Sequence, residues 1–259
     1  MHSSPSPNKP TKSFIHSLFD RISRRYDFFN RLSSLGLDQH WRKKTITSLK
    51  LAPGMRVLDC ASGTGDLARL AAETIVPLGF VAACDISHPM LQYAQRKFAR
   101  ISPAHWHIQM VQARAESLPF AQENFDAATM GFALRNVAEL ETTFQEFYRV
   151  LKPGGRLSLL EFGRPQNPIL RLGHFLWLSV ALPVLGLLTT GAIWPFLYLR
   201  RSILRFMDPS EVVHRLRNAG FAQVKAERLD GGIVVLYQAI KGDAPFLDTP
   251  GHKINNIQT

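Results

Sequence analysis

The chain has 259 residues, 46% hydrophobic and 20% charged, with 31 basic against 20 acidic residues and a formal net charge of +11. This length suffices for one large domain with additions or for two small ones, and the apolar content excludes a disordered chain. Two cysteines exclude a disulfide scaffold and a cysteine-rich metal site and are typical of a reducing compartment, and the first ten residues lack the apolar core of a secretory signal.

The two ends and the segment before the first strand are predicted to be distinct from the core. Residues 1–13 and 242–259 are rich in Ser, Pro or Gly and are expected to be disordered tails. In residues 14–50, the spacing of Phe14, Leu18 and Ile22 favours a cap of short amphipathic helices.

Residues 51–163 alternate between short apolar strands and helices. Helices are predicted at 63–72, 89–100 and 140–151, with a turn at Lys152–Gly155. Strict alternation of this kind predicts a parallel sheet covered by helices on both faces. The strands are predicted at Arg56–Asp59, Phe80–Cys84, Ile108–Gln112, Phe125–Met130 and Arg156–Phe162.

Residues 164–206 contain an apolar run, Leu172–Leu199, of 28 residues without a formal charge. This run is long enough to span a membrane. Its internal Pro and Gly residues instead favour two short helices that form a lid or dip into a membrane; buried core helices and a true span remain alternatives. The interrupting residues are Pro183, Gly186, Gly191 and Pro195.

The last folded part is predicted to complete the sheet. In residues 207–241, a helix at 209–219 precedes strands at 221–228 and 233–240, which are separated by Gly231-Gly232. Two strands joined so closely predict an antiparallel hairpin.

The excess positive charge lies outside the predicted core. Residues 51–163 contain 10 basic and 11 acidic residues, whereas 11–50 contain 9 and 3, and 200–228 contain 7 and 3. Such a surface attracts nucleic acid or anionic lipid, or is simply solvated. The basic clusters are Arg24-Arg25, Arg42-Lys43-Lys44, Arg200-Arg201 and Arg205.

The strongest chemical signal is the glycine-rich run Val57-Leu-Asp-Cys-Ala-Ser-Gly-Thr-Gly-Asp66. Gly63 and Gly65 let a ligand approach the backbone, and the amides that open the next helix point there. Asp85 ends the following strand, 20 residues after Gly65, where its carboxylate can accept both ribose hydroxyls. These features predict a nucleoside-cofactor site.

Asp59 distinguishes between two cofactors. Gly63–Ala68 also fits the dinucleotide fingerprint G-x-G-x-x-A, which alone is a weak signal. A carboxylate at Asp59 would repel a pyrophosphate, but it suits the ammonium group of S-adenosylmethionine, which has no phosphate. We therefore expect S-adenosyl-L-methionine as the cofactor rather than a dinucleotide.

Several motifs resemble class I S-adenosylmethionine-dependent methyltransferases. Their combination across residues 14–241 is similar to the ubiquinone/menaquinone biosynthesis C-methyltransferase family. The resemblance implies a Rossmann-like α/β fold with a mostly parallel seven-stranded sheet, helices on both faces, an antiparallel C-terminal hairpin and a helical lid. The motifs are Asp59–Asp66, Asp85-Ile-Ser87, Ala115–Phe120, Leu134-Arg-Asn-Val137, Tyr148–Gly155, Arg25-Tyr-Asp27, Asn30, Leu35-Gly-Leu37, Trp41-Arg42 and Gly231-Gly-Ile-Val234.

The resemblance implies C-methylation of a polyprenylated quinol ring, from demethylmenaquinol to menaquinol or the ubiquinone-pathway equivalent, late in respiratory quinone biosynthesis. An aromatic carbon is a poor nucleophile until a neighbouring hydroxyl ionises, so the enzyme must orient the ring and assist proton removal. Arg135 would stabilise the phenolate or orient a water, because a guanidinium is too basic to act as the base.

The resemblance also assigns residues to the two ligands. Catalytic roles fall to Arg135, Asn136 and Tyr26, and the quinol site to Tyr26, Asp27, Asn30 and Arg135. Arg135 could instead form a surface salt bridge, and Tyr26 could serve packing. The cofactor-binding residues would be Asp59, Gly63, Thr64, Gly65, Asp85, Ile86, Arg114, Ala115 and Gly131.

Two positions depart from the family pattern. Arg114 stands where the family usually has an Asp or Asn that accepts from the adenine amino group, and arginine offers only donors. Gly191–Phe196 is apolar and aromatic where the family is polar and acidic. Because of Arg114, we expect that backbone groups alone recognise the adenine or that the cofactor is bound more weakly. A different lipophilic phenol as substrate, or a non-catalytic membrane-associated scaffold, remains an alternative.

The remaining chemically active side chains are expected to be structural. His40 and His174 could act as bases but have no identifiable partner, and Cys60 and Cys84 should be small buried hydrophobes on neighbouring strands. No metal-ligand spacing occurs in the sequence.

The apolar lid and the basic clusters together predict a cytoplasmic protein that associates peripherally with an anionic membrane. A nucleic-acid partner is not expected, because Gly131–Asn136 lacks the Asn-Pro-Pro-aromatic run of enzymes that methylate a flipped base. Self-association into a homo-oligomer is compatible with the sequence.

Overall fold

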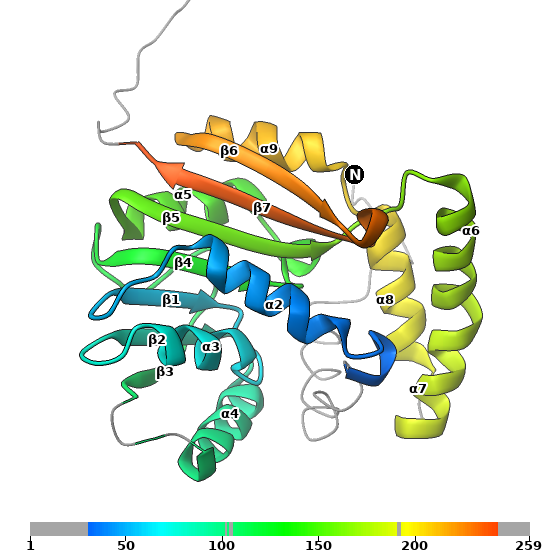
Figure 1. Cartoon of the computed structure of the whole chain (residues 1–259), viewed down its shortest axis with the longest axis horizontal. Helices are drawn as coiled ribbons and strands as arrows, with labels where there is room; N and C mark the ends of the chain where they lie inside the picture. Colours follow the sequence, from blue (N-terminus) through cyan, green and yellow to red (C-terminus); the bar gives the residue numbers. More distant parts are fainter. Residues whose placement is uncertain (1–30, 102, 104–105, 191–192, 243–259) are drawn as a thin grey trace, which may run out of the picture.

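A seven-stranded sheet forms the centre of the computed structural model, which describes residues 31–101, 103, 106–190 and 193–242 (Figure 1). The strand order is β3-β2-β1-β4-β5-β7-β6, and β7 runs antiparallel to both of its neighbours while β1 to β5 are parallel. The predicted fold class is thereby confirmed. The strands are β1 (Arg56–Cys60), β2 (Phe80–Asp85), β3 (Ile108–Gln112), β4 (Phe125–Gly131), β5 (Leu151–Phe162), β6 (Phe221–Leu229) and β7 (Val234–Lys241).

Helices cover both faces of the sheet (Figure 1). Successive residues of a strand point to opposite faces, so Val57 packs with the helices α2 to α4, while Leu58 packs with α5 and α9. The central strands β1 and β2 are therefore buried along nearly their whole length. The helices of these two layers are α2 (Leu37–Ser48), α3 (Asp66–Thr74), α4 (His88–Ile101), α5 (Leu140–Val150) and α9 (Pro209–Asn218).

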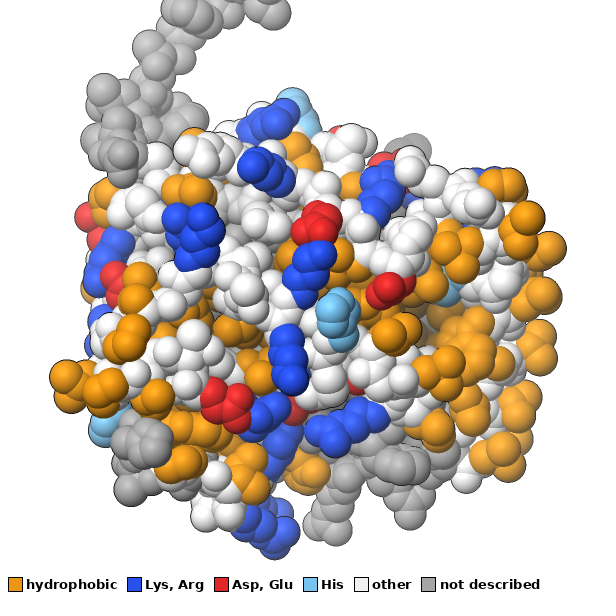
Figure 2. All heavy atoms as spheres, in the orientation of Figure 1, with side chains coloured by type: hydrophobic (Ala, Val, Ile, Leu, Met, Phe, Trp, Pro, Cys, Tyr) orange, Lys and Arg blue, Asp and Glu red, His pale blue; other side chains and the backbone are white. Residues whose placement is uncertain are grey.

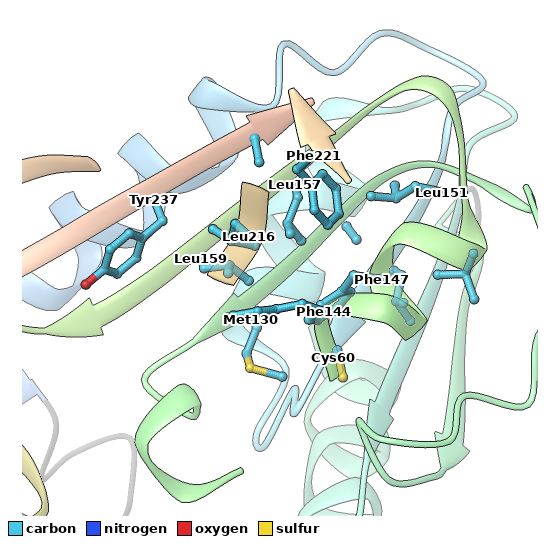
Figure 3. Close-up of a cluster of buried hydrophobic side chains, with 14 of the residues drawn as sticks. Cys60, Met130, Phe144, Phe147, Leu151, Leu157, Leu159, Leu216, Phe221 and Tyr237 are labelled. Carbon is cyan, nitrogen blue, oxygen red and sulfur yellow. The ribbon is translucent and has the colours of Figure 1, made fainter. Parts of the chain in front are cut away.

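The larger apolar cluster lies between the sheet and the α5–α9 layer (Figure 3). Phe144 and Phe147 of α5 are fully buried there, and burial of one such aromatic side chain contributes about 3 kcal/mol. Cys60 and Cys84 stand opposite each other on β1 and β2, both buried and free, as expected. The hydrogen bond with Cys84 and burial raise the pKa of the Cys60 thiol. The packing of this layer fixes the positions of the strand ends at which the candidate site lies.

The predicted turn at Lys152–Gly155 is wrong, because β5 already begins at Leu151. Phe125 pairs with Leu151 and Ala127 with Arg156, so four residues of β5 lie opposite the single residue Asp126. This irregular bulge, with Gly154 at a φ of 73°, absorbs the extra residues without ending the strand.

The apolar run forms a helical hairpin at one side of the sheet (Figure 1). The helix does not break at Pro183, contrary to the prediction, but runs without interruption through α6 (Pro168–Leu176), the π-helical turn Trp177–Ala181 and α7 (Leu182–Thr190). A proline ring clashes with the carbonyl four residues earlier, here Ser179, and the wider π-turn accommodates it. The second helix, α8 (Trp194–Arg205), packs on Gly186, where a Cβ would stand 1.9 Å from the Phe196 ring.

The first helix of this hairpin meets the length and composition of a membrane span. Pro168–Leu188 comprises 21 residues with a mean hydropathy of 1.6, and 28% of it is buried against the protein. Its apolar character is therefore directed mainly outwards.

The segment before β1 is described only from residue 31 onwards. In α2, Trp41 is buried and its Nε1 donates a hydrogen bond to Asp230, which lies in the short helical turn Asp230–Gly232 between β6 and β7. The predicted helical residues Phe14, Leu18 and Ile22 lie outside the described part of the chain.

Candidate active site

A pocket of about 180 Å³ lies at the carboxyl ends of β1, β2 and β4. Six of the nine predicted cofactor residues line it: Gly63, Asp85, Ile86, Arg114, Ala115 and Gly131. Ten further residues complete the wall, and sequence reasoning did not assign them to the cofactor. They are Ala61, Ser87, Met90, Ala113, Glu116, Phe132, Ala133, Asn136, Val137 and Ala138.

Asp85 is held at the end of β2 by two backbone amides. Its Oδ2 accepts from Gly63 N and its Oδ1 from Ser87 N, both at 2.8 Å. A carboxylate oxygen has a second lone pair, so Asp85 can still accept hydroxyl protons from a ligand in the pocket. The arrangement suits the ribose of a nucleoside.

The two glycines of the turn have different functions. Both have a positive φ, 55° at Gly63 and 81° at Gly65. A Cβ at Gly65 would stand 2.6 Å from Phe98 Cζ of α4, whereas a Cβ at Gly63 meets nothing within 4 Å. Gly65 therefore permits close helix packing and Gly63 leaves space for a ligand. Thr64 is buried, and neither it nor Gly65 lines the pocket.

Asp59 lies beneath the glycine turn rather than in the pocket wall. Its side chain is buried, and Oδ2 accepts from Ala68 N at 2.8 Å, while Oδ1 has no hydrogen-bond partner among the described residues. Burial raises the pKa of Asp59 to about 8, against the opposing hydrogen bond and the charge of Arg42. Its predicted contact with the cofactor ammonium stays a prediction.

Arg42 does not belong to a basic surface, and that prediction is wrong. The residue is buried, with Nε 3.6 Å from Asp38 and 3.8 Å from Asp66, and its guanidinium lies 5.5 Å from the Phe132 ring centre. Burial raises the pKa of Asp66, but the charges of Arg42 and Lys97 outweigh it and the pKa is lowered. Arg42 thus stabilises the negative charges of the acids near the glycine turn.

Arg114 points towards a neighbouring acid. Its guanidinium lies 3.4 Å from Glu116 Oε1, and the same oxygen accepts from Ala138 N at 3.1 Å. Arg114 also forms an antiparallel bridge with Ser117. Residues 113–116 of this turn line the pocket, and recognition of adenine by main-chain groups stays a prediction.

Arg135 is buried in an ion pair that is not at the surface. Its Nη1 lies 2.6 Å from Glu161 Oε1 and also donates to Phe132 O at 2.6 Å, and its backbone N donates to Glu161 Oε2 at 3.1 Å. Arg135 is only 5% exposed and Glu161 is fully buried. The guanidinium does not line the pocket, and its Nε has no acceptor among the described residues.

Glu161 was missed by sequence reasoning. The available signal was an acid inside the otherwise apolar end of β5, Leu157–Phe162. A carboxylate in such a position requires a buried cation, and Arg135 supplies it.

Asn136 is the predicted catalytic residue that reaches the pocket. It ends the short helical turn Leu134–Asn136 that follows β4, and its Oδ1 accepts from the hydroxyl of Tyr198 at 2.9 Å. This bond orients the amide, so its nitrogen remains a donor for a ligand. Tyr198 belongs to α8, and burial raises its pKa. Tyr198 lies within the apolar run, and the sequence pattern did not indicate its contact with Asn136.

Three predicted substrate residues fall outside the described part of the chain, and two candidate bases lie away from the pocket. Tyr26, Asp27 and Asn30 lie outside the described residues. His40 is exposed on α2, and His174 is buried on α6, where burial lowers its pKa. Neither histidine lines the pocket.

A sequence profile of the ubiE/COQ5 methyltransferase family matches residues 7–241. A ubiquinone/menaquinone biosynthesis C-methyltransferase of Syntrophotalea carbinolica is 42% identical over 225 residues, 86% of this chain and 92% of that protein. A demethylmenaquinone methyltransferase of Desulfitobacterium hafniense is 34% identical over 90% of this chain and 92% of its own length.

Solved structures share the fold at low identity. The cyclase SpnF superposes with a TM-score of 0.67 at 17% identity, covering 91% of this chain and 98% of SpnF. A SAM-dependent methyltransferase of Aquifex aeolicus gives 0.57 at 19% identity, covering 90% and 99%. Because the same fold serves a cyclase and a methyltransferase, these structures support the architecture alone.

Substitution of the two glycines should separate packing from ligand binding. Gly65→Ala combines a left-handed backbone with a collision at Phe98, and we expect it to lower the unfolding free energy by about 2–4 kcal/mol. Gly63→Ala should cost about 1 kcal/mol in stability but weaken S-adenosylmethionine binding about tenfold or more, because its methyl group enters the pocket. Urea unfolding and calorimetric titration measure the two effects; similar effects of both variants on both quantities would contradict the assignment.

Asp59 should make stability depend on pH. Because its pKa is raised from 3.8 to about 8, the stabilisation by the neutral carboxyl is complete below pH 3.8 and is lost as the pH rises to about 8. Asp59→Asn keeps an acceptor for Ala68 N but cannot ionise, so its unfolding free energy should decline less over this range. Denaturant unfolding at several pH values tests this, and identical pH profiles for both proteins would refute it.

Proposed function

Because the chain belongs to the ubiE/COQ5 methyltransferase family, we propose that this S-adenosylmethionine-dependent methyltransferase methylates a ring carbon of a polyprenylated quinol. The substrate is demethylmenaquinol or the ubiquinone-pathway equivalent, and the reaction belongs to a late stage of respiratory quinone biosynthesis. Two relatives whose names state this chemistry match along nearly their whole length, which supports the proposal.

One observation in the structure carries the proposal. Asn136 belongs to the wall of the cofactor pocket and is hydrogen-bonded to Tyr198 of the apolar hairpin. The cofactor pocket and the exposed apolar hairpin therefore meet at one side chain. A substrate with a polar ring and a long isoprenoid tail requires this combination.

The pocket residues fit S-adenosylmethionine. When bound, this cofactor supplies an electrophilic methyl group on a sulfonium. Asp85 would accept the ribose hydroxyls, Gly63 would leave room for the ligand, and Ala113–Glu116 would hold the adenine. Asp59, whose Oδ1 is unpartnered in the described part of the chain, lies behind the turn, and a nearby cationic ligand would lower its raised pKa and favour the carboxylate, whereas a phosphate would not.

The side chains after β4 stabilise the ionised quinol. The amide nitrogen of Asn136 donates to the phenolate oxygen, and Tyr198 holds that amide in the required orientation. The positive charge of Arg135, the residue before Asn136, lowers the energy of the phenolate, although the negative charge of Glu161 offsets part of this effect. Arg135 is fixed by three hydrogen bonds and does not act as the base.

Exposed apolar residues of the hairpin support our proposal that the protein binds a membrane surface, from which the quinol enters. Figure 2 shows hydrophobic side chains gathered over α6 and α7. On the long helix, six of them recur every three or four residues and form one stripe along its outer side, and Leu170, Phe175 and Leu188 are exposed beside it. The residues are Ile169, Leu172, Leu176, Val180, Val184 and Leu187, with Trp194 at the start of α8.

Methyl transfer from labelled S-adenosylmethionine to demethylmenaquinol in detergent tests the proposed activity. Tyr198→Phe should lower kcat about tenfold with unchanged cofactor affinity, because the ring packing remains and only the hydrogen bond to Asn136 is lost. Tyr148→Phe removes a hydroxyl from the α5 side of the sheet and serves as the matched control. Cofactor binding without methylation would favour another lipophilic phenol, and neither binding nor methylation would favour a scaffold role.

Sedimentation with phosphatidylglycerol vesicles tests membrane binding. The double variant Leu172→Asp/Leu176→Asp should lose most of its vesicle-bound fraction, because charges then interrupt the exposed stripe. Leu78→Asp/Ile101→Asp places the same charges at two exposed positions away from the hairpin and should bind more strongly than the stripe variant. Equal binding of both variants would contradict docking through the hairpin.

A further inference from the structure

A second cavity, of about 520 Å³, lies outside the cofactor pocket at the base of the helical hairpin. Its walls come from the end of β5, the start of α6, the end of α8, the start of α9, and β6 and β7, which converge beside the hairpin in Figure 1. No wall residue is shared with the cofactor pocket. The proposed quinol reaction does not use this cavity.

Three arginines from three different elements line this cavity. Arg164 precedes α6 and pairs with Asp208 at 2.8 Å, which is the one acid in the wall. Arg171 and Arg228 are exposed, and no hydrogen bond or ion pair of their guanidinium groups occurs among the described residues. The cavity therefore carries two uncompensated positive charges and attracts an anion.

A buried tyrosine adds a hydrogen-bond donor to the same cavity. Tyr237 is 1% exposed, lines the cavity, and its hydroxyl has no partner among the described residues. Figure 3 shows this hydroxyl directed away from the apolar cluster in which its ring is packed. Burial raises the pKa of Tyr237, so the group remains a protonated donor.

These observations together point to a built anion site. We propose that Arg171, Arg228 and Tyr237 bind a phosphate ester group in this cavity. Guanidinium groups match phosphate oxygens in bidentate geometry, and a hydroxyl donor completes the set. The N-terminus of α9, which begins at Pro209 in the wall, adds the positive end of a helix dipole.

The position of the cavity favours a lipid headgroup over a soluble phosphate. Arg171 lies between Ile169 and Leu172, the first two residues of the exposed apolar stripe. A phospholipid whose headgroup enters the cavity can lay its acyl chains along that stripe. This assignment of the source rests on the proposed membrane docking, whereas the phosphate chemistry does not.

Two double variants of equal charge test the site. Arg171→Gln/Arg228→Gln removes both unpaired cavity charges, and Arg96→Gln/Arg100→Gln removes two exposed charges from α4, distant from the hairpin. Vesicles of phosphatidylcholine with and without phosphatidylglycerol, a short-chain soluble phosphatidylglycerol and inorganic phosphate are the probes. Tyr237→Phe is a third variant, and thermal unfolding verifies that each protein is folded.

We expect the cavity variant to bind phosphatidylglycerol vesicles and the short-chain lipid about tenfold more weakly, with the α4 variant nearer to the unaltered protein. Tyr237→Phe should weaken binding of the short-chain lipid in the same direction. Methyl transfer to a detergent-solubilised quinol should not change in the cavity variant, which distinguishes this site from the proposed activity.

Other results would overturn the proposal in separable ways. Equal losses in the two double variants would show that net charge alone acts and that the cavity is no site. Binding of inorganic phosphate lost in the cavity variant, with unchanged vesicle binding, would retain the phosphate site and overturn the lipid source. If the unaltered protein ignored vesicles but still methylated the quinol, membrane docking would fail while the activity stood.

Discussion

The buried ion pair between Arg135 and Glu161 connects the parts on which the site depends. Glu161 comes from the end of β5 and Arg135 from the turn after β4, and the pair is almost completely removed from water. Desolvation of two charges costs several kcal/mol per ion, so the pair does not stabilise the fold by its mere presence. It makes every other arrangement of the turn worse, because either charge alone would be buried without a partner.

That constraint determines where the neighbouring residues lie. With Arg135 fixed to Phe132 O and to Glu161, Asn136 must face the pocket, and Tyr198 can reach it from the hairpin. Phe132 adopts a φ of 58°, which is unfavourable for a bulky side chain, and its ring packs on Trp41 and Phe162. Local backbone strain is thus retained by surrounding contacts at the edge of the sheet that carries the cofactor pocket.

The cofactor pocket, the arginine-lined cavity and the hairpin lie at separate places on the molecule. The cofactor pocket lies on the β1–β4 side of the sheet, and the arginine-lined cavity lies on the β5–β6 side. The helical hairpin lies beside the arginine-lined cavity and contacts Asn136 of the cofactor pocket through Tyr198. In the arrangement that we propose, the lipid phase holds the tail, the apolar stripe meets the bilayer, and only the ring reaches the polar donors. Water-soluble phenols would gain little from such a layout.

Much of this protein is determined by sequence pattern alone. The alternation of apolar strands and helices specifies the mostly parallel sheet. The spacing of Gly63, Gly65 and Asp85 places a nucleoside site at the edge of that sheet. Both signals can be recognised in the sequence because they depend on residues that are close together in the chain. The tertiary structure alone decided which polar groups are paired. The sequence predicts Arg42 as a surface charge, but the residue is buried. Glu161 is predicted only as part of a strand, but its carboxylate pairs with Arg135. Tyr198 is predicted only as part of the lid, but its hydroxyl orients Asn136. Each of these partnerships joins residues far apart in the chain, and a buried charge or donor is stable only where folding brings its partner, which no local pattern encodes.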